Sequence, residues 1–102
     1  MNISLDYDQT YTRDPDLWNE FILSARIRKH QVFIVTMRYE KSEAIPQDVA
    51  SMVNRVIYTE RRGKRAKMQF LQLPIDIWID DTPDFIIYDA ADAMPPSARA
   101  AA

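Results

Sequence analysis

Residues 2–12 read NISLDYDQTYT and combine a short strand with two carboxylates, which three hydroxyl residues follow. We expect a buried strand over Asn2–Leu5, so that Asp6 and Asp8 emerge at its carboxyl end. In open α/β sheets this edge is where ligands bind. Two anions this close raise each other's pKa unless a cation or a shared proton relieves the repulsion. A hard divalent cation such as Mg²⁺, which prefers oxygen ligands, is therefore expected here.

The segments that follow predict a parallel sheet. Asp14-Pro15 is typical of a helix start, and apolar residues then recur at three- and four-residue spacing, as in an amphipathic helix. Val32–Val35 is a continuous β-branched and aromatic run, which indicates a strand buried on both faces. Strand, helix and strand in this order form a right-handed parallel unit. Thr36, directly after the second strand, should therefore lie at the same sheet edge as Asp6.

A basic run comes after the next expected strand, Val56–Tyr58. Residues 61–67 read RRGKRAK and hold the densest charge in the chain. Such a run is usually a solvated turn. It could equally draw a polyanion such as nucleic acid toward the site. The sequence leaves both interpretations open.

A second pair of acids follows the fourth expected strand, Ile75–Ile79. The segment DDTP over residues 80–83 places two adjacent carboxylates there, and buried acids are costly unless they are paired or bound to a metal. Asp84–Tyr88 could be a short helix or a fifth strand. Beyond that point Ala, Pro and Ser dominate, so we predict one domain over residues 1–89 and a flexible tail over residues 90–102.

Composition excludes several classes of protein. The 102 residues carry a formal net charge of -2 and contain no cysteine, which rules out disulfides, thiol catalysis and thiolate metal sites. The single glycine rules out a phosphate loop of the G-x-x-x-x-G-K type. No stretch approaches the roughly 18 apolar residues of a membrane span, and no secretory signal is visible. We expect a cytoplasmic protein that does not bind membranes.

Taken together, the first acid pair, the threonine, a lysine of the basic run and the second acid pair resemble the four motifs of the haloacid dehalogenase superfamily. Most members of this superfamily are Mg²⁺-dependent phosphatases. The resemblance covers about residues 1–89 and implies a three-layer, Rossmann-like α/β fold with a parallel sheet. The intervals between the motifs hold only a helix, and a helix with one strand. A cap domain does not fit, so the site should be open.

The resemblance also implies a role for each motif residue. Asp6 would be the nucleophile that forms an aspartyl phosphate, and Asp8 would act as general acid and then general base. Thr36 and Lys67 would stabilise charge on the transferring oxygens. Lys67 is favoured as the motif lysine because it precedes an expected helical stretch, and Lys64 is the alternative.

The same resemblance implies a metal and a substrate set. Mg²⁺ would be held by Asp6, by Asp8 through its carbonyl, and by Asp81. Asp80 would lie behind the direct ligand, although either member of this pair could be the ligand.

Three further residues are candidate substrate contacts, namely Thr10, Arg38 and Lys64. Gln9 departs from the family pattern because many relatives have glycine at this position.

We therefore predict a Mg²⁺-dependent phosphomonoester hydrolase. Its partner would be a phosphorylated small molecule or a phosphorylated macromolecular end, and a neighbouring subunit of an oligomer could cover the open site. One alternative is a phosphatase for nucleic-acid 3′-phosphate ends, which the open site and the basic run favour. The other is a regulatory module that binds a metal or phosphate without turnover.

Overall fold

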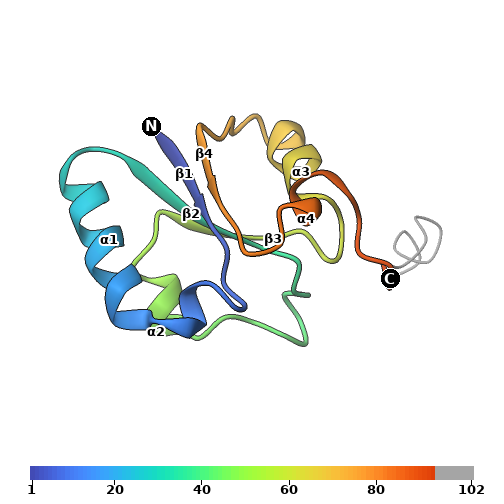
Figure 1. The fold of residues 1–102 in the computed structure, drawn as a ribbon, viewed down its shortest axis with the longest axis horizontal. Helices are drawn as coiled ribbons and strands as arrows, with labels where there is room; N and C mark the ends of the chain where they lie inside the picture. Colours follow the sequence, from blue (N-terminus) through green and yellow to red (C-terminus); the bar gives the residue numbers. More distant parts are fainter. Residues whose placement is uncertain (94–102) are drawn as a thin grey trace.

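The computed structural model describes residues 1–93 and contains a four-stranded, all-parallel sheet with the order β3-β2-β1-β4 (Figure 1). The strands are β1 (Asn2–Leu5), β2 (Gln31–Thr36), β3 (Arg55–Tyr58) and β4 (Ile77–Ile79). Helices cover both faces of this sheet, with α1 and α2 on one side and α3 and α4 on the other (Figure 1). The predicted α/β class with a parallel, Rossmann-like sheet is confirmed.

The helices differ in how clearly the sequence marks their starts. They are α1 (Pro15–Ile27), α2 (Gln47–Ala50), α3 (Lys64–Phe70) and α4 (Asp84–Ile87), and a 3₁₀ turn, η1 (Tyr11–Arg13), precedes α1. Asp14 caps α1, since its carboxylate accepts a hydrogen bond from the Leu17 N–H at 3.2 Å. The segment that could have been a helix or a strand is the one-turn helix α4.

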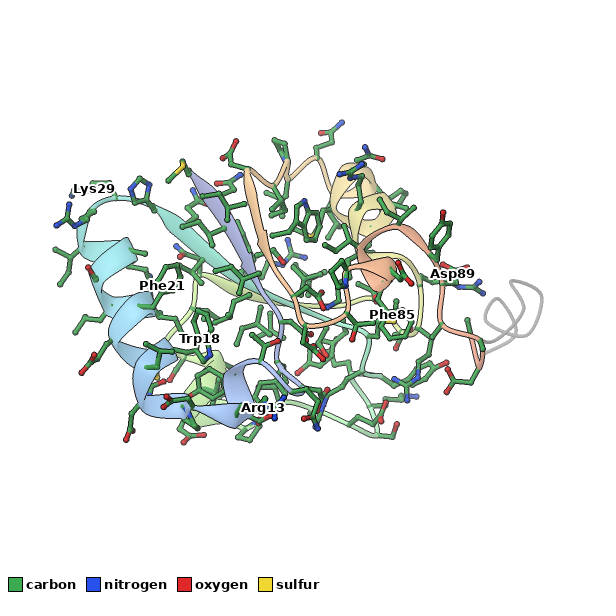
Figure 2. The ribbon with its side chains drawn as sticks, in the orientation of Figure 1. Arg13, Trp18, Phe21, Lys29, Phe85 and Asp89 are labelled. Carbon is green, nitrogen blue, oxygen red and sulfur yellow. The ribbon has the colours of Figure 1, made fainter. Side chains whose placement is uncertain are left out.

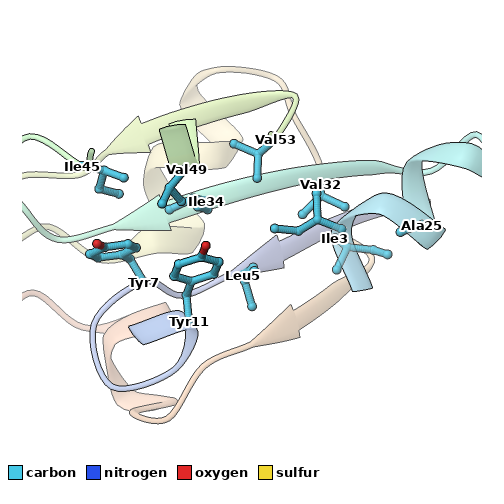
Figure 3. Packing of buried hydrophobic residues seen from close by; sticks show 11 residues of the cluster. Ile3, Leu5, Tyr7, Tyr11, Ala25, Val32, Ile34, Ile45, Val49 and Val53 are labelled. Carbon is cyan, nitrogen blue, oxygen red and sulfur yellow. The ribbon is translucent and has the colours of Figure 1, made fainter. Parts of the chain in front are cut away.

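Side chains of the central strands alternate between two cores. Val32 and Ile34 of β2 belong to the core beneath α1 and α2, and Figure 3 shows them among its buried side chains. Phe33 and Val35 point the other way and pack with Met68 of α3. This two-residue period is the expected result of a pleated strand buried on both faces.

The apolar stripe of α1 is narrower than the sequence pattern indicates. Trp18 and Phe21 pack against the core, and their rings meet edge to face at 5.7 Å (Figure 2). Leu17 and Ile27 also fit the apolar spacing, but they are 51% and 69% exposed and do not belong to the buried stripe.

The strand order brings two distant segments together at one edge. The chain moves from β1 outward to β2 and β3 and then crosses back to place β4 on the other side of β1. The order of strands therefore reverses between β1 and β4, which is the position where open α/β sheets bind ligands. The Asp6 N–H donates to the Ile79 carbonyl at 2.9 Å, so the carboxyl ends of these two strands lie side by side.

Contacts continue beyond residue 89, the predicted end of the domain. The Ala90 N–H donates to the Arg61 carbonyl at 2.8 Å, and Asp92 pairs with the Arg61 guanidinium at 3.2 Å. The remainder of the predicted tail, residues 94–102, lies outside the described residues. Within residues 1–93 no helix is both long enough and apolar enough to cross a membrane.

Candidate active site

A cleft of about 440 Å³ opens at the carboxyl ends of the strands. Asp6, which follows β1, and Asp81, which follows β4, both line it. Thr36, the last residue of β2, lines it too, as its position at the end of a parallel strand predicts. Three segments that the sequence singled out therefore converge at one place.

Asp6 is the centre of this arrangement, and its two oxygens have different partners. The side chain of Asp6 is only 9% exposed, and its Oδ1 accepts a hydrogen bond from the Lys64 ammonium at 2.8 Å. Its Oδ2 accepts from the Thr10 hydroxyl at 3.2 Å. The same ammonium also donates to Asp80, whose side chain is 3% exposed. Lys64 thus compensates two buried carboxylates at once.

Asp81 completes a group of three acids on the other side of Asp6. The Thr10 hydroxyl lies 3.3 Å from Asp81 Oδ1. One carboxylate oxygen from each of Asp6, Asp80 and Asp81 can be chosen so that all three lie within 4.8 Å of one another. Converging carboxylate oxygens are the ligands that a hard divalent cation prefers, so these residues fit the predicted Mg²⁺.

The carboxyl group of Asp6 holds its proton to an unusually high pH when no cation is bound. Burial, together with the hydrogen bond shared with Asp81, raises the pKa of Asp6 to about 7, although Lys64 acts in the opposite direction. The hydrogen bond from Asp6 lowers the pKa of Asp81 below its usual value. Asp6 is therefore the member of the pair that takes up a proton first as the pH falls, and binding of a cation would compete with that proton.

The lysine that contacts the acids differs from the one that the sequence interpretation favoured. Lys64 contacts the acids and is 2% exposed, whereas the Lys67 ammonium lies 5.8 Å from the centre of the Phe70 ring. The helix α3 starts at Lys64, four residues earlier than expected, so its first residue occupies the place assigned to Lys67. Gly63 precedes this helix, and a Cβ there would lie 2.6 Å from a backbone oxygen of α4, so a larger residue would not fit at this point.

Asp8 lies in a different environment from Asp6. The guanidinium of Arg38 donates two hydrogen bonds to its carboxylate, at 2.8 and 2.9 Å, and the Asp8 side chain remains 52% exposed. Arg38 in turn lies over the ring of Tyr7, 4.9 Å from its centre. Asp6 and Asp8 both line the cleft, and Arg38 holds the Asp8 side chain. The role that the resemblance implies for Asp8 in metal binding involves its carbonyl oxygen, so that role stays a prediction.

Thr36 and Gln9 shape the backbone around the cleft. The Thr36 hydroxyl is buried and accepts a hydrogen bond from the Arg38 N–H at 3.3 Å. Gln9 adopts a φ of 62°, in the left-handed region that glycine tolerates best. Many members of the superfamily that the sequence resembles have glycine at this position. The left-handed backbone of Gln9 is a conformation that glycine adopts without strain.

The basic run does not form a free positive patch. Arg61 pairs with Glu43 at 3.1 Å and with Asp92 at 3.2 Å, and Arg62 pairs with Asp89 at 3.0 Å. Counting Lys64, three of the five cations in residues 61–67 lie in ion pairs with acids from other segments. The solvated-turn interpretation and the polyanion interpretation both missed this pairing.

The cleft has further lining residues that the sequence did not indicate, namely Glu43, Met37 and Phe85. Glu43 lies in a segment that reads only as a polar loop, and Phe85 lies in the segment of undecided structure. No local pattern marks either residue, because their place in the cleft depends on contacts between distant segments.

Comparison of the chain with models of protein families, with curated proteins and with solved structures finds no match. The arrangement of its own residues therefore has to support any function assigned to it.

Proposed function

We propose that the protein is a Mg²⁺-dependent phosphomonoester hydrolase of the haloacid dehalogenase kind, which acts through an aspartyl phosphate on Asp6. The observation that carries the proposal is the environment of Asp6. It is a buried carboxylate at the sheet's switch point, with the Lys64 ammonium on one oxygen and Asp81 beside the other. Such a perturbed carboxylate in a cleft is typical of a functional group.

The cation would be held by Asp6 and Asp81, with Asp80 as the third carboxylate within reach. The hydrogen bond from Lys64 to Asp80 supports Asp81 as the direct ligand, because Asp81 has no such contact with the ammonium among the described residues. When bound, Mg²⁺ would supply positive charge that favours the carboxylate form of Asp6 and offsets the charge of the phosphoryl oxygens.

Asp6 would act as the nucleophile in the first half of the reaction. Its carboxylate oxygen forms a bond to phosphorus while the bond from phosphorus to the ester oxygen breaks, and the leaving oxygen takes up a proton. Water then attacks the phosphorus of the aspartyl phosphate and gives a proton to the Asp8 carboxylate, while the bond from phosphorus to the Asp6 oxygen breaks. This step releases phosphate and regenerates Asp6. Lys64 and Thr36, which line the cleft, would stabilise charge on the transferring oxygens.

Asp8 is the residue proposed to give a proton to the leaving oxygen, and its salt bridge with Arg38 has to open before it can do so. A carboxylate that accepts two hydrogen bonds from Arg38 cannot give a proton to a leaving oxygen in the same position. Asp8 must therefore exchange Arg38 for the substrate during turnover. Its 52% exposed side chain leaves room for this rotation.

Hydrolysis of 4-nitrophenyl phosphate tests the proposal. We expect Mg²⁺-dependent release of nitrophenol that Asp6→Asn and a chelator each abolish. Asp16→Asn, which neutralises an exposed acid in the first turn of α1, is the matched control and should retain activity. Hydrolysis that persists in Asp6→Asn would refute the proposal.

A module that binds metal and phosphate without turnover is the second candidate. The Arg38–Asp8 salt bridge favours it, because it holds the proposed proton carrier in an ion pair. Beryllium fluoride, which mimics a phosphoryl group on a carboxylate, separates the two. Adduct formation at Asp6 without hydrolysis of any phosphomonoester would favour the module over the enzyme.

A further inference from the structure

The cleft is lined by two large apolar side chains that the chemistry at phosphorus does not use. Phe85 of α4 and Met37, which follows β2, line the same cleft as Asp6 and Asp81. Figure 2 shows Phe85 on the side of the molecule where α4 lies, and the residue remains 36% exposed. A partly exposed aromatic ring in a charged cleft offers a contact surface for an apolar ligand group.

The charge of the cleft disfavours a second anionic group on the ligand. Five carboxylates and three cationic side chains line it, an excess of two negative charges. A divalent cation would offset this excess, and the phosphoryl dianion of a substrate would then restore it. A further phosphate would therefore enter a region that is already negative.

The cations at the rim are also already paired. Arg38 holds Asp8 at 2.8 Å, while Arg61 holds Glu43 at 3.1 Å and Asp92 at 3.2 Å. A polyanion would have to displace these carboxylates before it could use either guanidinium. This observation argues against the use of the basic run to bind nucleic acid.

From these observations, and resting on the proposed function, we infer that the substrate is a small phosphomonoester whose leaving group is uncharged and carries an apolar ring. The ring would lie against Phe85 and Met37 while the phosphoryl group lies over Asp6. A cleft of about 440 Å³ can hold a molecule of this size, since ligand pockets of about 300–1,000 Å³ take drug-sized molecules. Phe85 is thus a specificity-determining residue, outside the group of side chains that act on phosphorus.

Benzyl phosphate and ethyl phosphate test this inference, because both release alkoxides of similar basicity. The wild type should hydrolyse benzyl phosphate with a kcat/KM about tenfold higher, the size expected for one aromatic contact. Phe85→Ala should lower kcat/KM for benzyl phosphate by about tenfold and change kcat/KM for ethyl phosphate by less than about twofold. Equal effects on both esters, or no preference in the wild type, would overturn the inference.

Two further variants guard against a change in the fold. Ile87→Ala, an exposed position on the same helix, should leave the preference unchanged. Phe85→Leu keeps an apolar side chain and should retain part of the preference, about threefold. If Ile87→Ala lost the preference as fully as Phe85→Ala, the effect would belong to α4 as a whole and the inference would fail.

The nucleic-acid alternative is one outcome of the same experiment. A 3′-phosphorylated oligodeoxynucleotide should be hydrolysed more slowly than benzyl phosphate, and its rate should depend little on salt. A faster rate that falls steeply between 50 and 200 mM salt, the behaviour of a protein that binds phosphates through cations, would overturn the inference.

A binding measurement separates this inference from the proposed function. Benzylphosphonate and methylphosphonate cannot be hydrolysed, and calorimetry in the presence of Mg²⁺ can follow their binding. Tighter binding of benzylphosphonate by about tenfold, lost in Phe85→Ala, would support the inference even if no ester were hydrolysed. Hydrolysis of both esters without preference would refute the inference and leave the proposed function intact.

Discussion

The raised pKa of Asp6 predicts an unusual dependence of stability on pH when no divalent cation is bound. Its pKa lies at about 7 in the folded chain and at 3.8 when the carboxyl is unperturbed. A group with a raised pKa contributes stability that is fully present below the unfolded value and is lost as pH rises through the folded value. The free energy of unfolding should therefore fall between about pH 4 and pH 7 because of this one carboxyl.

The size of the effect follows from the difference between the two pKa values. About three pKa units, at about 1.4 kcal/mol each, give a loss of about 4 kcal/mol across this range. Asp6→Asn cannot ionise, and its amide can donate to Asp81 while its oxygen still accepts from Lys64. The variant should therefore be less sensitive to pH than the wild type, and at pH 8 it should be the more stable of the two.

Urea unfolding in the presence of a chelator, followed by tryptophan fluorescence from pH 4.5 to 8.5, measures both proteins. The difference in their free energies of unfolding isolates Asp6, because all other groups titrate in both. A difference that stays constant over this range would refute the assignment of the proton to Asp6. Adding Mg²⁺ at pH 8 should then stabilise the wild type more than Asp6→Asn, because the cation replaces the lost proton.

Three other substitutions test the surrounding structure. Lys64→Met should lower the free energy of unfolding by about 3–5 kcal/mol, because it leaves buried carboxylates without their cation. Lys67→Met, the control, should change the free energy of unfolding by less than about 0.5 kcal/mol. Similar denaturant midpoints for the two variants would contradict the placement of Lys64. Gly63→Ala should cost about 1–3 kcal/mol in the same assay, since its Cβ would lie 2.6 Å from a backbone oxygen of α4, and an unchanged midpoint would show that the two helices do not pack this closely. Gln9→Gly should raise the free energy of unfolding by about 0.5–1 kcal/mol, because glycine adopts the φ of 62° at residue 9 without strain. Gln69→Gly, within α3, should lower the free energy of unfolding by about 1 kcal/mol. A fall in the thermal midpoint of Gln9→Gly would argue against left-handed backbone at residue 9.

Local signals were sufficient for most of the secondary structure. β1 has the predicted bounds, Asn2–Leu5, and α1 starts at Pro15 directly after Asp14, as predicted. A short strand and the start of a capped helix are encoded within a few residues. β4 is shorter than predicted, and starts at Ile77 rather than Ile75. The length of β4 is set by its pairing with β1, and the sequence of β4 alone does not show where that pairing begins.

The candidate site also has a part that the sequence predicts and a part that it does not. That acids follow β1 and β4, and that Thr36 follows β2, can be read from the chain, and the rule for parallel strands places them at one edge. Which lysine meets them could not be read, since Lys64 and Asp6 are 58 residues apart and the choice depends on where α3 begins.

The sequence by itself thus determined the parallel α/β sheet and the carboxylates at its edge, because periodicity, capping and strand order act over short stretches. Only the tertiary structure decided the partners of each charge: Lys64 with Asp6, Arg38 with Asp8, and Arg61 with Glu43. The physical reason is that an ion pair forms between whichever side chains the packed elements bring within about 4 Å, and this distance depends on the positions of all of the elements together.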